Sequence, residues 1–163
     1  MTRNFLITLA ILGLTNCSNF KGPSAPIQAD KIDYIIFGRY CGNAAFPPYA
    51  RMFKIEKNRL LVDTTDSFYN NNRNIVFNGD TATKEQFDKT LTLRQNIYEF
   101  FLTSKDSVYG NPDNRDQCGL YLEFKFENKI RRFDFDPYKV DDYPIEIKNT
   151  SDVLQSLLND LDN

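Results

Sequence analysis

The chain has 163 residues, with 20 Lys and Arg, 22 Asp and Glu and no histidine, which gives a net charge of −2 at neutral pH. A mildly acidic chain without a run of basic residues is a poor match for nucleic acid or for electrostatic binding to anionic lipid. The lack of histidine excludes Ser-His-Asp and Cys-His nucleophilic systems and every His-ligated metal site. We therefore expect neither a metal nor a cofactor.

The N-terminus has the pattern of an export signal. Arg3 precedes ten uncharged, mainly apolar residues, numbers 5–14. Ten helical residues cover about 15 Å, roughly half of a bilayer core, so this stretch is a signal-peptide h-region and is too short to span a membrane. It ends in Leu14-Thr15-Asn16-Cys17.

This tetrapeptide resembles the lipobox of bacterial lipoproteins, although Asn16 departs from the Gly, Ala or Ser that the pattern prefers. The resemblance implies cleavage before Cys17, which makes residues 1–16 the signal peptide. It also implies a lipid anchor of fatty acyl chains such as palmitate on Cys17, and hence a membrane of the bacterial envelope. No acidic run follows Cys17 as a surface-export signal, which favours the periplasmic side. The alternative is an ordinary secretory signal in which Cys17 is a bystander.

Residues 17–30 are polar and contain Gly22, Pro23 and Pro26, which predicts a flexible tether. Residues 31–163 have the length of one globular domain. In an exported domain the two remaining cysteines, Cys41 and Cys118, predict one disulfide. Two buried free thiols are the alternative.

The first strands are predicted in the segment 32–63. Residues 32–37 form an apolar run that ends at Gly38, and residues 39–50 read as a loop. Residues 51–63 predict a hairpin with Lys57-Asn58 as its turn. The predicted cross-strand pairs are Ile55 with Leu60 and Phe53 with Val62.

A second hairpin is predicted at residues 120–136, where apolar and polar residues alternate. With Asn128-Lys129 as the turn, the core pairs would be Phe124 with Phe133 and Leu122 with Phe135. The other face would then oppose like charges, Glu123 with Asp134 and Lys125 with Arg132. Like charges directly opposite one another repel, and this repulsion is weak only where water screens it. This face is therefore expected to be solvated.

Two helical segments complete the prediction. Thr83 and Gln86 form a capping box that opens a helical region at about 83–102, which Thr90 and Thr92 can split. Thr150 is expected to cap a helix at about 151–161 with one apolar stripe. The fold class is therefore α+β: an antiparallel sheet of hairpins, four to six strands in all, with both helical segments on one face.

Three groups of residues are candidate sites. Asp134 and Asp136 are the carboxylates suited to hydrolysis, although a solvated face explains them equally well. The Asn- and Asp-rich residues 111–116 lack the spacing of a calcium loop, and a turn accounts for them. Tyr40, Phe46 and Tyr49 lie in a loop beside the predicted disulfide and are candidate contacts for a partner, or else they cap the core.

The sequence contains no catalytic motif, so we expect a non-catalytic binding or interaction module. Apart from its lipobox, the chain resembles small uncharacterised lipoproteins of the bacterial envelope, and that resemblance implies no activity. An envelope protein is the expected partner. The competing interpretation is a carboxylate-dependent, glycosidase-like hydrolase, which would require Asp residues in a concave pocket.

Overall fold

A computed structural model describes residues 22–42, 49–70, 72–77, 79, 81–112 and 117–162. Within them six strands form one mixed sheet in the order β3-β2-β1-β5-β6-β4. Every neighbouring pair is antiparallel except β4 with β6, which is parallel. The strands are β1 (Ile32–Cys41), β2 (Ala50–Glu56), β3 (Arg59–Val62), β4 (Val108–Tyr109), β5 (Cys118–Phe126) and β6 (Lys129–Phe135).

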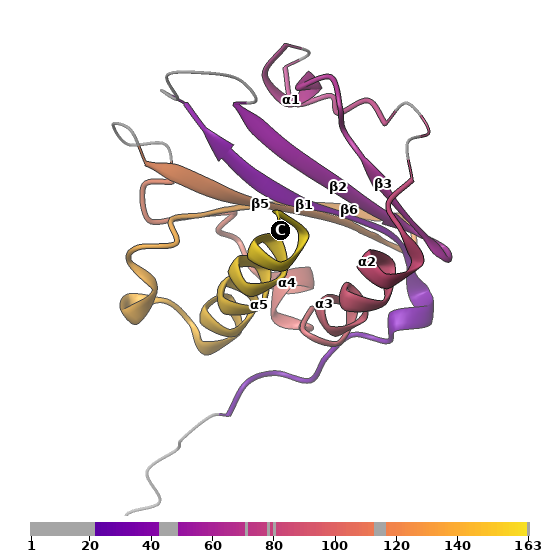
Figure 1. Ribbon diagram of the computed structural model, residues 1–163. Helices are drawn as coiled ribbons and strands as arrows, with labels where there is room; N and C mark the ends of the chain where they lie inside the picture. The colour runs from indigo at the N-terminus through magenta and orange to yellow at the C-terminus, as the bar shows by residue number, and fades with distance from the viewer. Residues whose placement is uncertain are drawn as a thin grey trace, which may run out of the picture.

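The predicted α+β class is confirmed, with the helices on one face of the sheet, which we call the inner face (Figure 1). This helical layer comprises α2 (Lys84–Lys89), α3 (Leu91–Gln95), α4 (Phe100–Thr103) and α5 (Ile145–Asp162). Short α1 (Ser67–Asn70) lies on the opposite, outer face, and 3₁₀ turns occupy Ala29–Lys31 and Val140–Asp142.

The main core lies between the inner face and the helical layer. Phe101 is at its centre, with its ring 4.8 Å from that of Phe133 and within 6.4 Å of those of Phe124 and Phe135. The leucines of α5 complete the core as the predicted stripe, with Leu154, Leu157, Leu158 and Leu161 all buried. Since each buried large apolar side chain contributes about 1.5–3 kcal/mol, this layer holds the fold together.

The first hairpin has the predicted register. Ile55 pairs with Leu60 and Phe53 with Val62, around a turn at Lys57-Asn58. Lys57 has a φ of 52°, a left-handed conformation that is unusual for a residue with a side chain.

The register predicted for the second hairpin is wrong. The turn is Glu127-Asn128, one residue earlier than expected, with Glu127 at a φ of 54°. Leu122 therefore pairs with Phe133, and Glu123 pairs with Arg132 instead of Asp134. The physical reason is electrostatic: the observed register places opposite charges across the strands, whereas the predicted one opposed like charges.

Several predicted element bounds also change. Strand β1 continues through Gly38 to Cys41, so the predicted loop at 39–50 loses its first residues. The capping box at Thr83 is confirmed, and the region after it is split at Thr90 as anticipated. Helix α5 begins at Ile145, so Thr150 lies within the helix and is not its cap. The Thr150 side chain is buried, and its hydroxyl donates to the carbonyl of Asn96 at 2.8 Å.

The tether prediction is wrong for residues 24–30, which we call the strap. The backbone amide of Ile27 donates to Ile97 at 2.8 Å, and its side chain is buried in the main core. Ser24 donates its backbone N–H to Glu146 on α5 at 2.7 Å. The strap thus runs along the helical layer before the chain enters β1 (Figure 1). Its sequence is polar, but its one isoleucine and its backbone hydrogen bonds fix it to the domain.

The outer face was predicted to be solvated, but part of it is buried. A second cluster of buried residues lies there beneath α1 and the following segment, and consists of Ile36, Tyr40, Ala50, Met52, Phe68 and Tyr121. Glu123 and Asp134 project from the same face and are only 5% and 8% exposed. The long connection between β3 and α2 therefore covers acidic groups that the sequence pattern predicted to be exposed to solvent.

Candidate functional site

The predicted aromatic loop does not form one contact surface in the described residues. Tyr40 belongs to β1 and is 1% exposed, where its ring packs on Phe68 at 5.0 Å. Tyr49 is partly exposed and its ring meets that of Tyr69 edge-on at 6.4 Å. Phe46 lies outside the described residues, as do Cys17 and most of the 111–116 segment. Tyr40 therefore caps the outer cluster, and its burial removes it from direct contact with a partner.

The predicted disulfide joins Cys41 and Cys118. The two residues are directly opposite one another at the end of the β1–β5 ladder, with their Cα atoms 4.1 Å apart. The bond fixes the register of the two central strands, β1 and β5, at the end of their ladder. It thereby holds Tyr40, the preceding residue, in place above the outer face.

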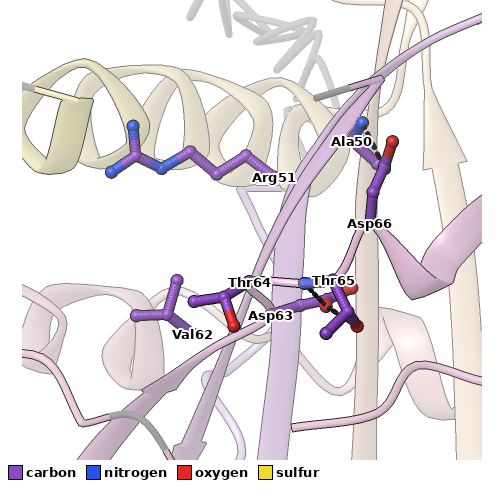
Figure 2. A pocket seen from close by; sticks show the side chains of 7 residues that line it. All are labelled: Ala50, Arg51, Val62, Asp63, Thr64, Thr65 and Asp66. Carbon is purple, nitrogen blue, oxygen red and sulfur yellow. Dashed lines mark hydrogen bonds between the residues drawn. The ribbon is translucent and has the colours of Figure 1, made fainter. Parts of the chain in front are cut away.

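A hollow of about 490 Å³ opens beside the end of β3, lined by Ala50, Arg51, Val62, Asp63, Thr64, Thr65 and Asp66 (Figure 2). Its two carboxylates are used by the backbone. Asp66 accepts from the amides of Tyr49 and Ala50, and Asp63 accepts from Thr65 and from the start of α1. We interpret this hollow as part of the chain connection, since its charged groups hold loops in position.

Arg51 at the rim of this hollow has a structural contact as well. Its guanidinium pairs with Asp162 at 2.7 Å and donates to the carbonyl of Leu161 at 3.2 Å. A cation at the carboxyl end of a helix stabilises the helix dipole and satisfies terminal carbonyls. Arg51 therefore ties β2 to the end of α5.

A more specific arrangement surrounds Glu123 on the outer face. Its Oε1 accepts a hydrogen bond from the Tyr34 hydroxyl at 2.8 Å. Its Oε2 accepts from the Tyr121 hydroxyl at 2.8 Å and from Nε of Arg132 at 2.6 Å. Burial, reinforced by the adjacent carboxylate, raises the pKa of both tyrosines well above the ordinary value near 10. Both phenols therefore stay protonated as donors throughout the physiological range.

Asp134, two residues beyond Arg132 on β6, has an equivalent set of partners. The Tyr40 hydroxyl donates to its Oδ1 at 2.7 Å, and Nη1 of Arg73 donates to its Oδ2 at 2.9 Å. The Arg73 guanidinium also lies over the Phe68 ring, 5.2 Å from its centroid. Burial opposes the charge of Arg73, but the Asp134 carboxylate outweighs it and raises the pKa of the guanidinium.

These groups border a polar pocket of about 250 Å³, which we call the outer pocket. Its base is formed by strands β1 and β5, and the segment 73–77 forms one wall. The lining residues are Tyr34, Ile36, Lys54, Arg73, Asn74, Ile75, Phe77, Glu123 and Arg132. The pocket thus gathers residues from four strands and from the segment after α1, which lie far apart in the sequence.

The two carboxylates considered as candidates for hydrolysis, Asp134 and Asp136, both accept hydrogen bonds from the protein. Both oxygens of Asp134 accept hydrogen bonds from protein side chains. Asp136 at the end of β6 is buried and accepts from the backbone amides of Tyr138 and Asn111. Asp134 and Asp136 therefore do not converge on a cleft as a catalytic pair.

Sequence reasoning missed Arg73 and Glu123 as site residues. Arg73 lies in an Asn-rich stretch that reads as a loop, and Glu123 reads as a polar residue on a solvated strand face. The available signal was the alternation in β5 and β6, which places Glu123, Arg132 and Asp134 on one face. In the observed register Glu123 is opposite Arg132, so a correct turn assignment would have revealed this pair, which is two of the nine residues that line the pocket.

No group of three or more Cys, Asp or Glu suited to holding a metal ion occurs in the described ranges. Among the helices that the structure describes, none is both long and apolar enough to cross a membrane. The chain matches no family model, and neither a curated protein nor a solved structure matches it.

Proposed function

We propose that the protein is a non-catalytic binding module, anchored to a membrane of the bacterial envelope through acylated Cys17, with the outer pocket as its ligand site. The observation that carries this proposal is the position of the strap. It attaches to the helical layer, on the opposite side of the sheet from the outer pocket. An anchor at Cys17 therefore favours an arrangement in which the pocket points away from the bilayer.

The chain length between anchor and domain supports this orientation. Seven residue steps separate Cys17 from Ser24, and a fully extended chain covers at most about 3.6 Å per residue. The point of attachment at Ser24 would thus stay within about 25 Å of the membrane surface. A domain of this size has a radius of gyration of about 14 Å, which for a uniform sphere corresponds to a diameter of about 36 Å, so the tether is shorter than the domain is wide. The helical side is then the side nearest to the lipid.

The state of the buried carboxylates supports binding over hydrolysis. Glu123 lines the outer pocket and Asp134 is paired with its Arg73, and these two acids accept from three and two side-chain donors respectively. A general acid or base must reach the substrate with a carboxylate oxygen, whereas both oxygens of Glu123 and of Asp134 are already occupied by donors from the protein. These acids are therefore suited to positioning other groups.

Hydroxyl-radical footprinting on lipid vesicles tests the proposed orientation. The acylated protein on vesicles is compared with the Cys17→Ala variant, which lacks the thiol that carries the lipid. We expect protection of Gln28 in the strap and of Leu102 beside it, and unchanged labelling of Tyr34 and Ile75 in the outer pocket.

Intact mass measurement provides the control, because the wild type must begin at Cys17 and carry acyl groups. A wild-type mass without lipid, or protection of Tyr34 and Ile75 on vesicles, would contradict the proposal.

A further inference from the structure

The two arginines of the outer pocket are far more exposed than the acids they pair with, although the charges around the pocket balance. Lys54, Arg73 and Arg132 pair with Glu56, Asp134 and Glu123 respectively. The acidic partners of the two arginines are covered: the side chains of Glu123 and Asp134 are 7% and 11% exposed. The arginine side chains are 63% exposed for Arg132 and 48% for Arg73. A solute entering the pocket therefore meets guanidinium groups before it meets carboxylates.

Both guanidinium groups are held in position before any ligand binds. Arg132 is fixed through its Nε to Glu123, and Arg73 through its Nη1 to Asp134. Each of these bonds uses one of the five N–H groups that a guanidinium carries. Arg73 is further fixed by stacking over the Phe68 ring. Side chains that are already ordered lose little conformational entropy on binding, so such an arrangement strengthens recognition.

Lys54 adds a third cation on the β2 side of the pocket. Its ammonium lies over the Tyr34 ring, 4.9 Å from the centroid, and pairs with Glu56 at 3.2 Å. The Tyr34 hydroxyl is directed to Glu123. The ring therefore links the position of Lys54 to the same hydrogen-bonded network that fixes Arg132.

We propose that the outer pocket binds the phosphate or carboxylate group of a small, soluble polar molecule between Arg73, Arg132 and Lys54. This inference rests on the proposed function, because it names the ligand of the same pocket. Planar guanidinium groups match the oxygen atoms of these anions and form paired, charge-assisted hydrogen bonds with them. A volume of about 250 Å³ accommodates the anionic group with a few further atoms, and it is smaller than the usual pocket of a drug-sized ligand.

Nuclear magnetic resonance of the arginine Nε–H groups tests the proposal on the protein purified from membranes in a non-ionic detergent. Inorganic phosphate and succinate serve as probes, with sodium chloride added to keep the ionic strength constant. We expect saturable shifts of the Arg132 and Arg73 signals with at least one probe. Arg132→Gln should weaken the affinity by about tenfold or more, the loss of roughly one charge-assisted contact.

Arg39→Gln is the matched control. Arg39 projects from the inner face of β1 and contacts Asp162 and Asn159 at the end of α5, so the substitution removes the same charge on the other side of the sheet. It should change the affinity by less than about twofold, as expected for a distant surface charge. Lys54→Gln is a second pocket variant that leaves Glu123 fully bonded, and it should weaken binding in the same direction.

Three results would overturn the inference. These are no saturable shift with either probe, equal weakening by Arg132→Gln and Arg39→Gln, and saturable shifts that appear only with vesicles of phosphatidylglycerol. The last result would identify a lipid headgroup as the source of the anion. Failure here leaves the footprinting result intact, because the footprint depends on the anchor and not on the ligand.

Discussion

Removal of the Cys41–Cys118 disulfide is expected to destabilise the protein mainly through the unfolded state. The two cysteines end a ladder of register partners that begins at Ile32 and Phe126, so β1 and β5 remain paired without the covalent bond. The bond closes a segment with a sequence separation of 77. For a loop of this length the chain-entropy relation gives about 4.5 kcal/mol. Because domains of this size have unfolding free energies of about 5–15 kcal/mol, the loss is a large part of the total.

Equilibrium unfolding in urea measures this effect with the double variant Cys41→Ala/Cys118→Ala. The midpoint should fall, and the dependence on denaturant should rise, because an unfolded chain without the cross-link exposes more surface. Wild type treated with reductant should unfold at the same urea concentration as the double variant. A loss below about 1 kcal/mol with an unchanged denaturant dependence would refute the reasoning, since the loop would then contribute little to the unfolded ensemble.

Three further predictions follow from single residues. Because burial raises the pKa of Tyr121, the folded protein keeps the phenolic proton above pH 10 while the unfolded chain loses it, so stability should fall with rising pH by up to about 1.4 kcal/mol per unit. Tyr121→Phe should reduce this slope in denaturation series at alkaline pH. Gly38→Ala should destabilise the protein by more than about 1 kcal/mol in thermal unfolding, because the added Cβ meets a backbone carbonyl of β2; an unchanged melting temperature would contradict that close approach. Glu127→Gly should raise stability by about 0.5–1 kcal/mol because it relieves a positive φ, whereas Asn128→Gly, at a neighbour without a positive φ, should lower it.

The elements with strong local signals were predicted correctly. The apolar stripe of α5 and the capping box at Thr83 depend on residues close in sequence, and both are present. The register of the first hairpin was correct because a turn at Lys57-Asn58 pairs all four apolar residues on one face, whereas a slip by one residue would separate them. Even there, the turn begins with a positive φ at Lys57, which the residue type does not favour.

The errors occurred where distant segments decide the outcome. The turn at Glu127 has an unfavourable positive φ, but it places Glu123 opposite Arg132. The alternation of apolar and polar residues does not indicate which of these opposing energies is larger. Thr150 resembles a helix cap in sequence, yet its hydroxyl bonds to Asn96 of the helical layer. The strap has the composition of a linker, and nothing near Ile27 in the sequence indicates that its side chain is buried. It is buried because it packs into the main core, which is formed by distant segments.

The outer pocket was beyond sequence reasoning for the same reason. Its cations come from β2, from β6 and from the segment after α1, and no spacing in the chain connects them. The alternation in β5 and β6 indicated a polar face. A polar face is equally consistent with exposure to solvent, with a catalytic site and with a binding site. The choice among these depends on whether the insertion after β3 covers the acids, and that contact is set by Phe68 packing on Tyr40 and Tyr121.

The buried charges on the outer face are difficult to explain by stability alone. Removing carboxylates from water carries a large desolvation penalty, and well-packed apolar residues in place of buried ion pairs are often neutral or stabilising. Glu123 and Asp134 are nevertheless covered, and each receives one arginine and at least one tyrosine. What this arrangement provides is two guanidinium groups fixed at the edge of a pocket and turned toward solvent. The proposal of an anionic ligand gives these buried acids a role, which is to hold the two cations in position.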